Sequence, residues 1–341
     1  MPKAFTPYTW QEAQKDFLTH IQAVRAPKTV RFYEVQLNNL VRWVEPQNIS
    51  LDHFGKRHLD SFLVFRQEKG ISQTTLHHDA IAAKVFLKWC VKNDIIERSL
   101  LADYEVRAAP TPPKYMPSEE DMQSLISAVQ SYYSPLSHPD IRFIHASKRA
   151  FHRERNFAIV LSLLDSACRI GEVLSLKVGD FQKAEGKRGS YWQIMIRESK
   201  GRTARMIPLS EPSSQAIQSW LKVRARVMSD IPKERDPGYL FLSEIGGKID
   251  ESKFLTLLKR YLKFAGLGER ITLHSLRRFS LNRLAKTSLA AAQDIAGHKD
   301  PKTTRIYTKL DSEFLLEVHT QANVVKSILT RKEVVSTKRI L

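Results

Sequence analysis

A proline-rich stretch divides this 341-residue chain and argues against a single continuous core. Residues 107–117 read RAAPTPPKYMP, with four prolines and no apolar periodicity. Because proline fixes φ and removes a backbone donor, such a stretch forms an extended, semi-rigid connection. A chain of this length also exceeds what one core usually organises. We therefore predict two domains, residues 1–106 and 118–320, joined by this linker and followed by a C-terminal tail at 321–341.

Apolar residues at helical spacing predict several helices across residues 9–103. Thr9 and Glu12 form a capping-box pattern that marks the start of the first helix. We expect four apolar stripes to face a core, with the following members: Trp10, Ala13, Phe17, Ile21 and Val24; Val30, Tyr33, Leu37, Leu40, Val41 and Val44; Leu59, Phe62, Leu63 and Phe65; and Leu76, Ile81, Val85, Phe86 and Trp89.

The second domain is predicted to be mainly helical, with one β-pattern. Ser118 and Asp121 mark a helix start, and a strong helix is expected from about Arg155 to Ser166. Two segments rich in β-branched and aromatic residues flank a turn at 198–201, which predicts a hairpin or part of a small sheet. Further helical periodicity covers 212–228, 251–265, 275–286, 288–296 and the residues after Asp311.

The segment 132–153 carries two prolines and is expected to be irregular. It is either an inserted loop for DNA or partner contact, or a tolerated surface insertion.

The formal net charge of +18 makes a polyanion the first partner to consider. Residues 1–110 carry 15 basic and 12 acidic residues, a net +3, which leaves +15 for the remainder. We therefore expect the larger domain to face phosphate. The two cysteines, Cys90 and Cys168, lie in apolar runs without a CxxC pair, which suits a reducing compartment. No secretory h-region or membrane-spanning run is evident, so a cytoplasmic protein is expected.

Five short polar stretches stand out in the second domain, although each is a weak signal alone. They are ACRIGE at 167–172, Lys200, HSLRR at 274–278, GH at 297–298 and TTRIY at 303–307. His274 and Arg277 stand at i, i+3, which places them on one helix face. His298 and Tyr307 are nine residues apart.

In this order and spacing, the set resembles the tyrosine recombinase, or phage integrase, family. The family pattern is an Arg in an R-x-x-E context, a β-hairpin Lys, H-x-x-R, G-H and a Tyr about nine residues later. The resemblance implies a mainly α fold, with an N-terminal helical core-binding (SAM-like) domain and a mainly helical catalytic domain with a small β-sheet. Two departures stand out. Arg278 stands where the family often has His, and it either adds positive charge to the site or points outward at DNA. Ser166-Ala-Cys before Arg169 replaces the usual Thr-Gly turn.

The chemistry explains why these residue types are needed. A phenol that displaces a DNA 5′ oxygen puts extra negative charge on the phosphorane-like transition state, which two guanidiniums can hold. We assign this task to Arg169 and Arg277, with Glu172 orienting or packing Arg169. The other roles are general base for His274, proton donor to the leaving 5′ hydroxyl for Lys200, phosphate hydrogen bonding for His298 and nucleophile for Tyr307.

The resemblance implies a covalent 3′-phosphotyrosyl intermediate that conserves the phosphodiester energy, so neither a metal nor another cofactor is expected. The sequence has no G-x-x-x-x-G-K-[ST] loop and no zinc deaminase pattern. We expect a site-specific recombinase acting on double-stranded DNA sites as a homo-oligomer, a tetramer on two sites, with accessory proteins as further partners.

Two alternatives stay open: a catalytically silent architectural DNA-binding protein of the same fold, and a type IB topoisomerase or telomere resolvase. A silent member should have lost Arg169, Arg277 or Tyr307, and all three are present. The tail also allows two arrangements, exchange into a neighbouring subunit or packing on its own domain. Its apolar residues are Phe314, Leu315, Val318, Val324, Val325 and Ile328.

Overall fold

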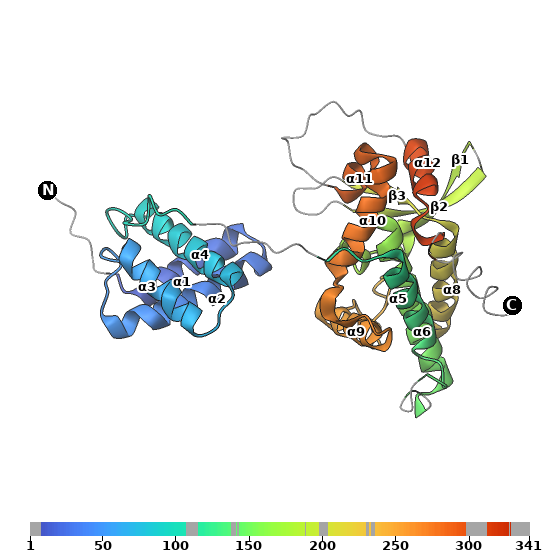
Figure 1. Ribbon diagram of the computed structural model, residues 1–341, viewed down its shortest axis with the longest axis horizontal. Coiled ribbons are helices and arrows are strands. Elements are labelled where there is room, and N and C mark those ends of the chain that lie inside the picture. Colours follow the sequence, from blue (N-terminus) through green and yellow to red (C-terminus); the bar gives the residue numbers. More distant parts are fainter. Residues whose placement is uncertain are drawn as a thin grey trace. The chain divides into compact units, whose positions relative to one another are not determined.

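The computed structural model divides into two compact units, Met1–Lys114 and Tyr115–Leu341, each with its own hydrophobic core (Figure 1). Both units are mainly helical, and the second contains a small sheet, which confirms the predicted fold class. The structure describes residues 8–106, 115–137, 141, 143–187, 189–197, 204–229, 232, 236–297, 312–326 and 328, with the side chains of 312–315 left out.

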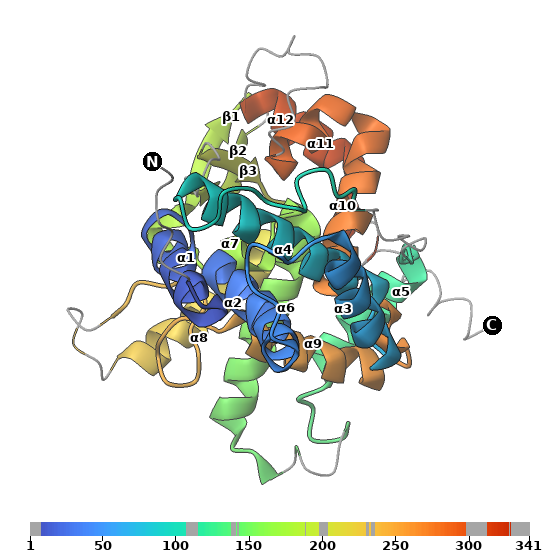
Figure 2. The same cartoon turned by 90° about the vertical axis from the view of Figure 1, so that its left-hand side faces the viewer.

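The first unit is built on four helices, as the apolar stripes predict. They are α1 (Trp10–Val24), α2 (Pro27–Val44), α3 (Lys56–Glu68) and α4 (Gln73–Lys92). Thr9 begins α1 with the expected capping box, because its side chain accepts from the Glu12 N–H while Glu12 accepts from the Thr9 N–H at 2.9 Å. Helices α1, α2 and α4 pack against one another (Figure 2).

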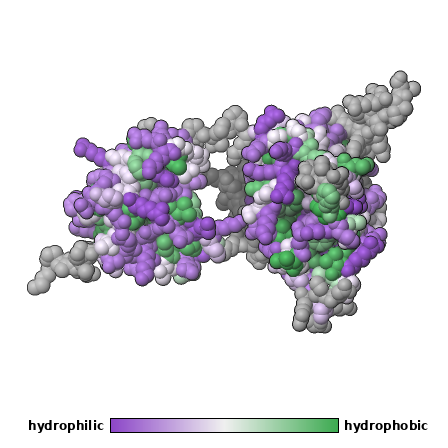
Figure 3. All heavy atoms as spheres, turned by 90° about the horizontal axis from the view of Figure 1, so that it is seen from below, coloured by the Kyte–Doolittle hydropathy of each residue, from purple (hydrophilic) through white to green (hydrophobic). Residues whose placement is uncertain are grey.

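Aromatic side chains fill the core of this unit. The Phe86 ring packs against both Trp10 and Phe17, with ring centroids 6.0 and 5.5 Å apart. Two predicted core residues are exposed instead: Val24 at the last residue of α1 (56% exposed) and Val85 on α4 (36%). Hydrophilic side chains cover most of the face of this unit shown in Figure 3.

The helices of the second unit follow the predicted order, except that the short helix Ile170–Val173 was not predicted. They are α5 (Glu119–Ser131), α6 (Ala146–Ser166), α7 (Ile170–Val173), α8 (Glu211–Met228), α9 (Glu251–Phe264), α10 (Leu273–Thr287), α11 (Leu289–Ala296) and α12 (Ser312–Ala322). Ser118 begins α5 with a capping box to Asp121, as predicted. The expectation that 132–153 is irregular is wrong for its last part, because His145 caps a helix that already runs from residue 146.

A three-stranded antiparallel sheet in the order β1-β2-β3 completes the second unit. Its strands are β1 (Phe181–Gly186), β2 (Gly189–Ile196) and β3 (Arg205–Pro208). The predicted pairing of the last two strands is confirmed, with Ile196 opposite Arg205. Strand β1 was not predicted.

The described residues of α12 and of the segment that follows it pack on the second unit. Val318, Val324, Val325 and Ile328 are all buried in the core of the second unit. The side chains of Phe314 and Leu315 lie outside the description. None of the helices in the described part of the chain is both long and apolar enough to cross a membrane.

Candidate active site

Arg277 lies at the centre of the site and joins the ends of two helices. It stands one turn into α10 and is only 3% exposed. Its Nη1 donates to the Ala167 carbonyl and its Nη2 to the Ala296 carbonyl, both at 2.7 Å. These carbonyls belong to the C-terminal ends of α6 and α11, where the helix dipole favours a cation. Ala167 adopts a left-handed conformation, with φ 50°, which ends α6.

Glu172 is the carboxylate around which three arginines gather. It lies on α7 and accepts the Arg169 backbone N–H at 2.8 Å. Its oxygens lie 3.2 Å from Arg205 Nη2, 3.6 Å from Arg169 Nη1 and 3.9 Å from Arg277 Nη1. Burial alone would raise the pKa of Glu172, but the Arg169 N–H and the Arg205 charge hold that pKa below its usual value. The carboxylate is therefore ionised at neutral pH.

Among the described residues, the cluster sets three guanidiniums against one carboxylate, and most of these side chains are buried. Burial, and then repulsion from Arg169, lower the pKa of Arg277 to about 10, so the guanidinium is still protonated at neutral pH. The Arg169 side chain is 35% exposed, whereas those of Arg277 and Glu172 are 4% and 9% exposed. An anion that reaches Arg169 from solvent would relieve the repulsion among the guanidiniums.

Cys168 lies beside this cluster as a buried free cysteine. Burial raises the pKa of its thiol to about 11. A thiol in that state is neutral at physiological pH, and the thiolate is the reactive form.

Arg205 is a member of the site that the sequence did not reveal. It opens β3 and is 10% exposed. Its Nε donates to the Ile295 carbonyl at 2.9 Å, and its Nη2 lies 3.7 Å from Cys168 Sγ as well as 3.2 Å from Glu172. The signal that could have identified it is an arginine at the start of the otherwise apolar segment RMIPL, because a buried guanidinium requires a carboxylate or carbonyl partner.

His274 and Arg278 flank Arg277 on α10 and differ in their surroundings. His274 is exposed in the first turn of the helix. Arg278 neither joins the arginine cluster nor projects outward, which corrects both expectations for it. Its Nη2 donates to the Tyr115 carbonyl at 3.1 Å and to Ser275 Oγ at 3.2 Å, so it holds the first residues of the second unit against α10.

Three predicted site residues, Lys200, His298 and Tyr307, lie outside the described residues. The structure thus brings together Arg169, Glu172 and Arg277, and places His274 on the helix that carries Arg277. Within the described part of the chain, no three His, Cys, Asp or Glu side chains are grouped to hold a metal ion.

A buried ion pair connects α12 to the helix that precedes Arg169. His319 Nε2 lies 2.9 Å from the Asp165 carbonyl and 3.2 Å from Asp165 Oδ1, and both side chains are at most 2% exposed. Asp165 also accepts the Ser210 N–H at 2.7 Å, at the start of α8. Burial alone would lower the pKa of His319, but the charge and hydrogen bonds of Asp165 raise it above the usual value.

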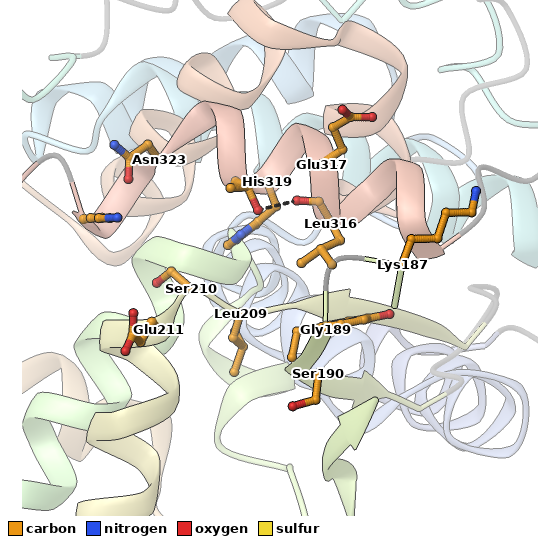
Figure 4. A pocket seen from close by; sticks show the side chains of 13 residues that line it. Lys187, Gly189, Ser190, Leu209, Ser210, Glu211, Leu316, Glu317, His319 and Asn323 are labelled. Carbon is orange, nitrogen blue, oxygen red and sulfur yellow. Dashed lines mark hydrogen bonds between the residues drawn. The ribbon is translucent and has the colours of Figure 1, made fainter. Parts of the chain in front are cut away.

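A cavity of about 890 Å³ lies next to this pair, between α12, the start of α8 and the β1–β2 turn (Figure 4). His319, Leu316, Ser210 and Lys187 are among the residues that line it. Of the predicted site residues that the structure describes, none lines this cavity. The arginine cluster is therefore a separate site.

Comparison with known proteins identifies the family. Residues 140–313 match the model of the phage integrase family, and residues 15–94 match the model of the phage integrase N-terminal SAM-like domain. Tyrosine recombinase XerC of Corynebacterium efficiens is 27% identical over 317 residues, which covers 92% of this chain and 91% of the relative. Tyrosine recombinase XerC of Alcanivorax borkumensis is 26% identical over 314 residues, covering 90% and 92%.

Solved structures share the fold. XerH recombinase bound to a palindromic difH substrate, in a post-cleavage complex, superposes with a TM-score of 0.64 at 20% identity and covers 93% of this chain and 85% of its own. A lambda integrase tetramer bound to a Holliday junction gives 0.61 at 14% identity, covering 89% and 80%. The chain thus shares the fold of these two proteins. The chain belongs to the phage integrase family of tyrosine recombinases.

Proposed function

We propose that this protein is a site-specific recombinase that cuts and rejoins DNA strands through a covalent tyrosine intermediate. The observation that carries the proposal is the partly buried cluster of Arg169, Arg205 and Arg277 around the carboxylate of Glu172. Such a cluster is suited to a phosphodiester, whose charge grows in the transition state. The relatives that match over nine tenths of the chain are tyrosine recombinases.

In the proposed reaction, the Tyr307 phenol attacks the scissile phosphorus and the bond from phosphorus to the 5′ oxygen breaks. His274 takes the phenol proton and Lys200 gives a proton to the departing 5′ hydroxyl, so charge and atoms balance. The DNA 3′ end remains joined to the tyrosine. Attack by a 5′ hydroxyl from another strand reverses these steps and restores a phosphodiester, which requires no external energy source.

The two main arginines differ in how they would hold the phosphate. Two of the five N–H groups of Arg277 already bind helix-end carbonyls, which fixes its guanidinium before substrate arrives. Arg169 is the more exposed of the two and would meet one non-bridging oxygen from the solvent side. Glu172 would orient Arg169, and His298 would hydrogen-bond the phosphate.

We further propose that the protein acts as a tetramer on two double-stranded recombination sites in the cytoplasm. The lambda integrase relative is a tetramer on a Holliday junction, and XerH binds its difH substrate. Residues 1–106 would form the core-binding domain, 107–117 the linker and 118–320 the catalytic domain. The 321–341 tail would exchange between subunits, with the contacts that Val324, Val325 and Ile328 make within one chain remade on a neighbour.

A nicked duplex tests this function. A recognition duplex is first recovered by selection from a random-sequence pool. A nick placed beside the cleavage site lets the short fragment that carries the new 5′ hydroxyl diffuse away after attack. The wild-type protein is expected to form an adduct that survives denaturation, at the same rate with or without EDTA. An architectural protein would bind the duplex but form no adduct, and this result would contradict the proposal.

A further inference from the structure

We propose that Arg205 is a positioning residue for strand cleavage, acting on Arg169 through Glu172 and on the end of α11 that leads to His298. The proposal rests on the function proposed above. Arg205 need not touch DNA in this role, because its contacts are to groups of the protein.

The side chain of Arg205 joins three segments that are distant in the sequence. Its Nη2 donates to Glu172 Oε2 at 3.2 Å, and the same oxygen accepts the Arg169 N–H at 2.8 Å. Its Nε donates to the Ile295 carbonyl at 2.9 Å, in the last turn of α11. Removing the guanidinium would therefore release both the carboxylate beside Arg169 and the end of α11.

Arg205 and Arg277 both bind backbone carbonyls at the end of α11. Arg205 binds the Ile295 carbonyl and Arg277 binds the Ala296 carbonyl, which are adjacent in the chain. The last four carbonyls of a helix have no partner within the helix, so two guanidiniums here satisfy groups that would otherwise need water. The direction in which the chain leaves α11 thus depends on both arginines.

The next residue, Gly297, lies directly against the Arg205 guanidinium. A Cβ at position 297 would stand 3.1 Å from Arg205 Nη1 and 3.2 Å from Cζ, and the residue has φ +61°. This tight fit places the Gly297 backbone close to the guanidinium. A shift of Arg205 would therefore move this backbone.

Arg205 also occupies a position in the chain that suits this role. It begins β3, five residues after Lys200 in the sequence. One side chain thus ties the strand that follows Lys200 to the helix end before His298 and to the cap of α7. The role calls for the planar fork of arginine, because lysine cannot donate in two fixed directions at once.

The test measures the single-turnover rate of adduct formation at saturating nicked duplex. Arg205→Ala is expected to lower this rate about 10²-fold, the effect of roughly 1 Å of misplacement, with little change in duplex affinity. Arg205→Lys, which keeps the charge but loses the fork, is expected to be about tenfold slower than wild type. A wild-type rate in folded Arg205→Lys or Arg205→Ala protein overturns the proposal.

Arg224 provides a matched control. It is 8% exposed, donates its Nε to the Tyr239 carbonyl at 2.9 Å and pairs with Asp236 at 2.6 Å, so it is a buried, carboxylate-bound arginine outside the site. Arg224→Ala is expected to lower the melting temperature while the adduct rate at a permissive temperature stays that of wild type. An equal loss of rate in Arg224→Ala and Arg205→Ala would indicate general destabilisation and overturn the proposal.

A double-mutant cycle with Glu172→Gln provides a readout that a merely structural role would not change. If Arg205 acts through Glu172, the double variant should be no slower than the slower single variant, whereas independent effects multiply. If the rate reductions of the two single variants multiply in the double variant, Arg205 does not act through Glu172 and the proposal is overturned. Absence of any wild-type adduct contradicts the proposed function as well, whereas a wild-type adduct with unaffected Arg205 variants contradicts only this inference.

Discussion

Replacing Glu172 with Gln removes a buried negative charge but keeps the shape of the side chain. Gln keeps an oxygen that can accept the Arg169 N–H, so the cap of α7 can persist. The three guanidiniums at 3.2, 3.6 and 3.9 Å would lose the charge that they share. The variant therefore tests the loss of the Glu172 charge separately from any change in packing.

The magnitude follows from the burial of the group. The Glu172 side chain is 9% exposed, and the Arg205 and Arg277 side chains are 10% and 4% exposed. Removing one partner of a buried pair typically costs about 3–5 kcal/mol, because a charge is left uncompensated. Since Gln keeps the backbone hydrogen bond, we expect a loss at the lower end, about 3 kcal/mol in the free energy of unfolding.

Scanning calorimetry on the full chain measures this loss. At about 2–4 °C per kcal/mol, the transition of the second unit should fall by about 6–12 °C. The transition of the first unit, which has a separate core, should not move. Asp236→Asn is the control, because Asp236 is 26% exposed and binds one arginine, so its loss should cost about 1 kcal/mol.

Saturating duplex should shrink the Glu172→Gln effect, because the scissile phosphate supplies an anion to the same guanidiniums. By linkage, the variant should bind duplex at least as tightly as wild type while it forms adduct more slowly. A loss below about 1 kcal/mol, within the range of an exposed pair, would refute the view that Glu172 balances the cluster.

Three further predictions follow from other parts of the structure. His319→Gln should destabilise the protein most below a pH of about 6.5. Because the folded-state pKa of His319 is raised, the stabilisation is complete below the unfolded-state pKa and is lost as the pH rises through the folded-state pKa. An equal loss of stability at pH 6 and pH 9 in thermal melts would contradict this. Gly297→Ala should lower the free energy of unfolding by about 1–2 kcal/mol because of the left-handed φ at this position. It should also displace Arg205 and slow adduct formation, and wild-type stability and rate would count against the close fit. Duplex affinity should fall about 10³-fold between 50 and 200 mM salt because most of the net charge lies in residues 111–341, and a nearly flat salt dependence in binding titrations would disagree.

The sequence predicts the helices well because their apolar faces repeat at 3.6 residues. The errors occur where burial is decided by neighbours rather than by spacing. Val24 ends α1 and is exposed there, and Val85 lies on the outer side of α4. Strand β1 reads FQKAEG, and Phe181 is its one buried residue, so hydrophobic alternation could not identify it.

The site is predictable in its motif residues but not in their supports. Arg169, Glu172 and Arg277 are recognisable from order and spacing, and the structure gathers them. Arg205 belongs to no helical or β-alternation motif, and its partners Glu172 and Ile295 are 33 and 90 residues away in the chain. Arg278 likewise meets Tyr115 across 163 residues. Contacts at such separations depend on tertiary packing, which local pattern does not encode.

The central claim is that Tyr307 attacks the DNA backbone. Proteolysis of the adduct formed on the nicked duplex, followed by mass spectrometry of the DNA-linked peptide, tests it most directly. We expect a peptide that contains Tyr307 joined to a 3′ phosphate, a free 5′ hydroxyl on the released fragment and no adduct from Tyr307→Phe. Linkage at another residue, a 5′ linkage, or full adduct formation by Tyr307→Phe would contradict it.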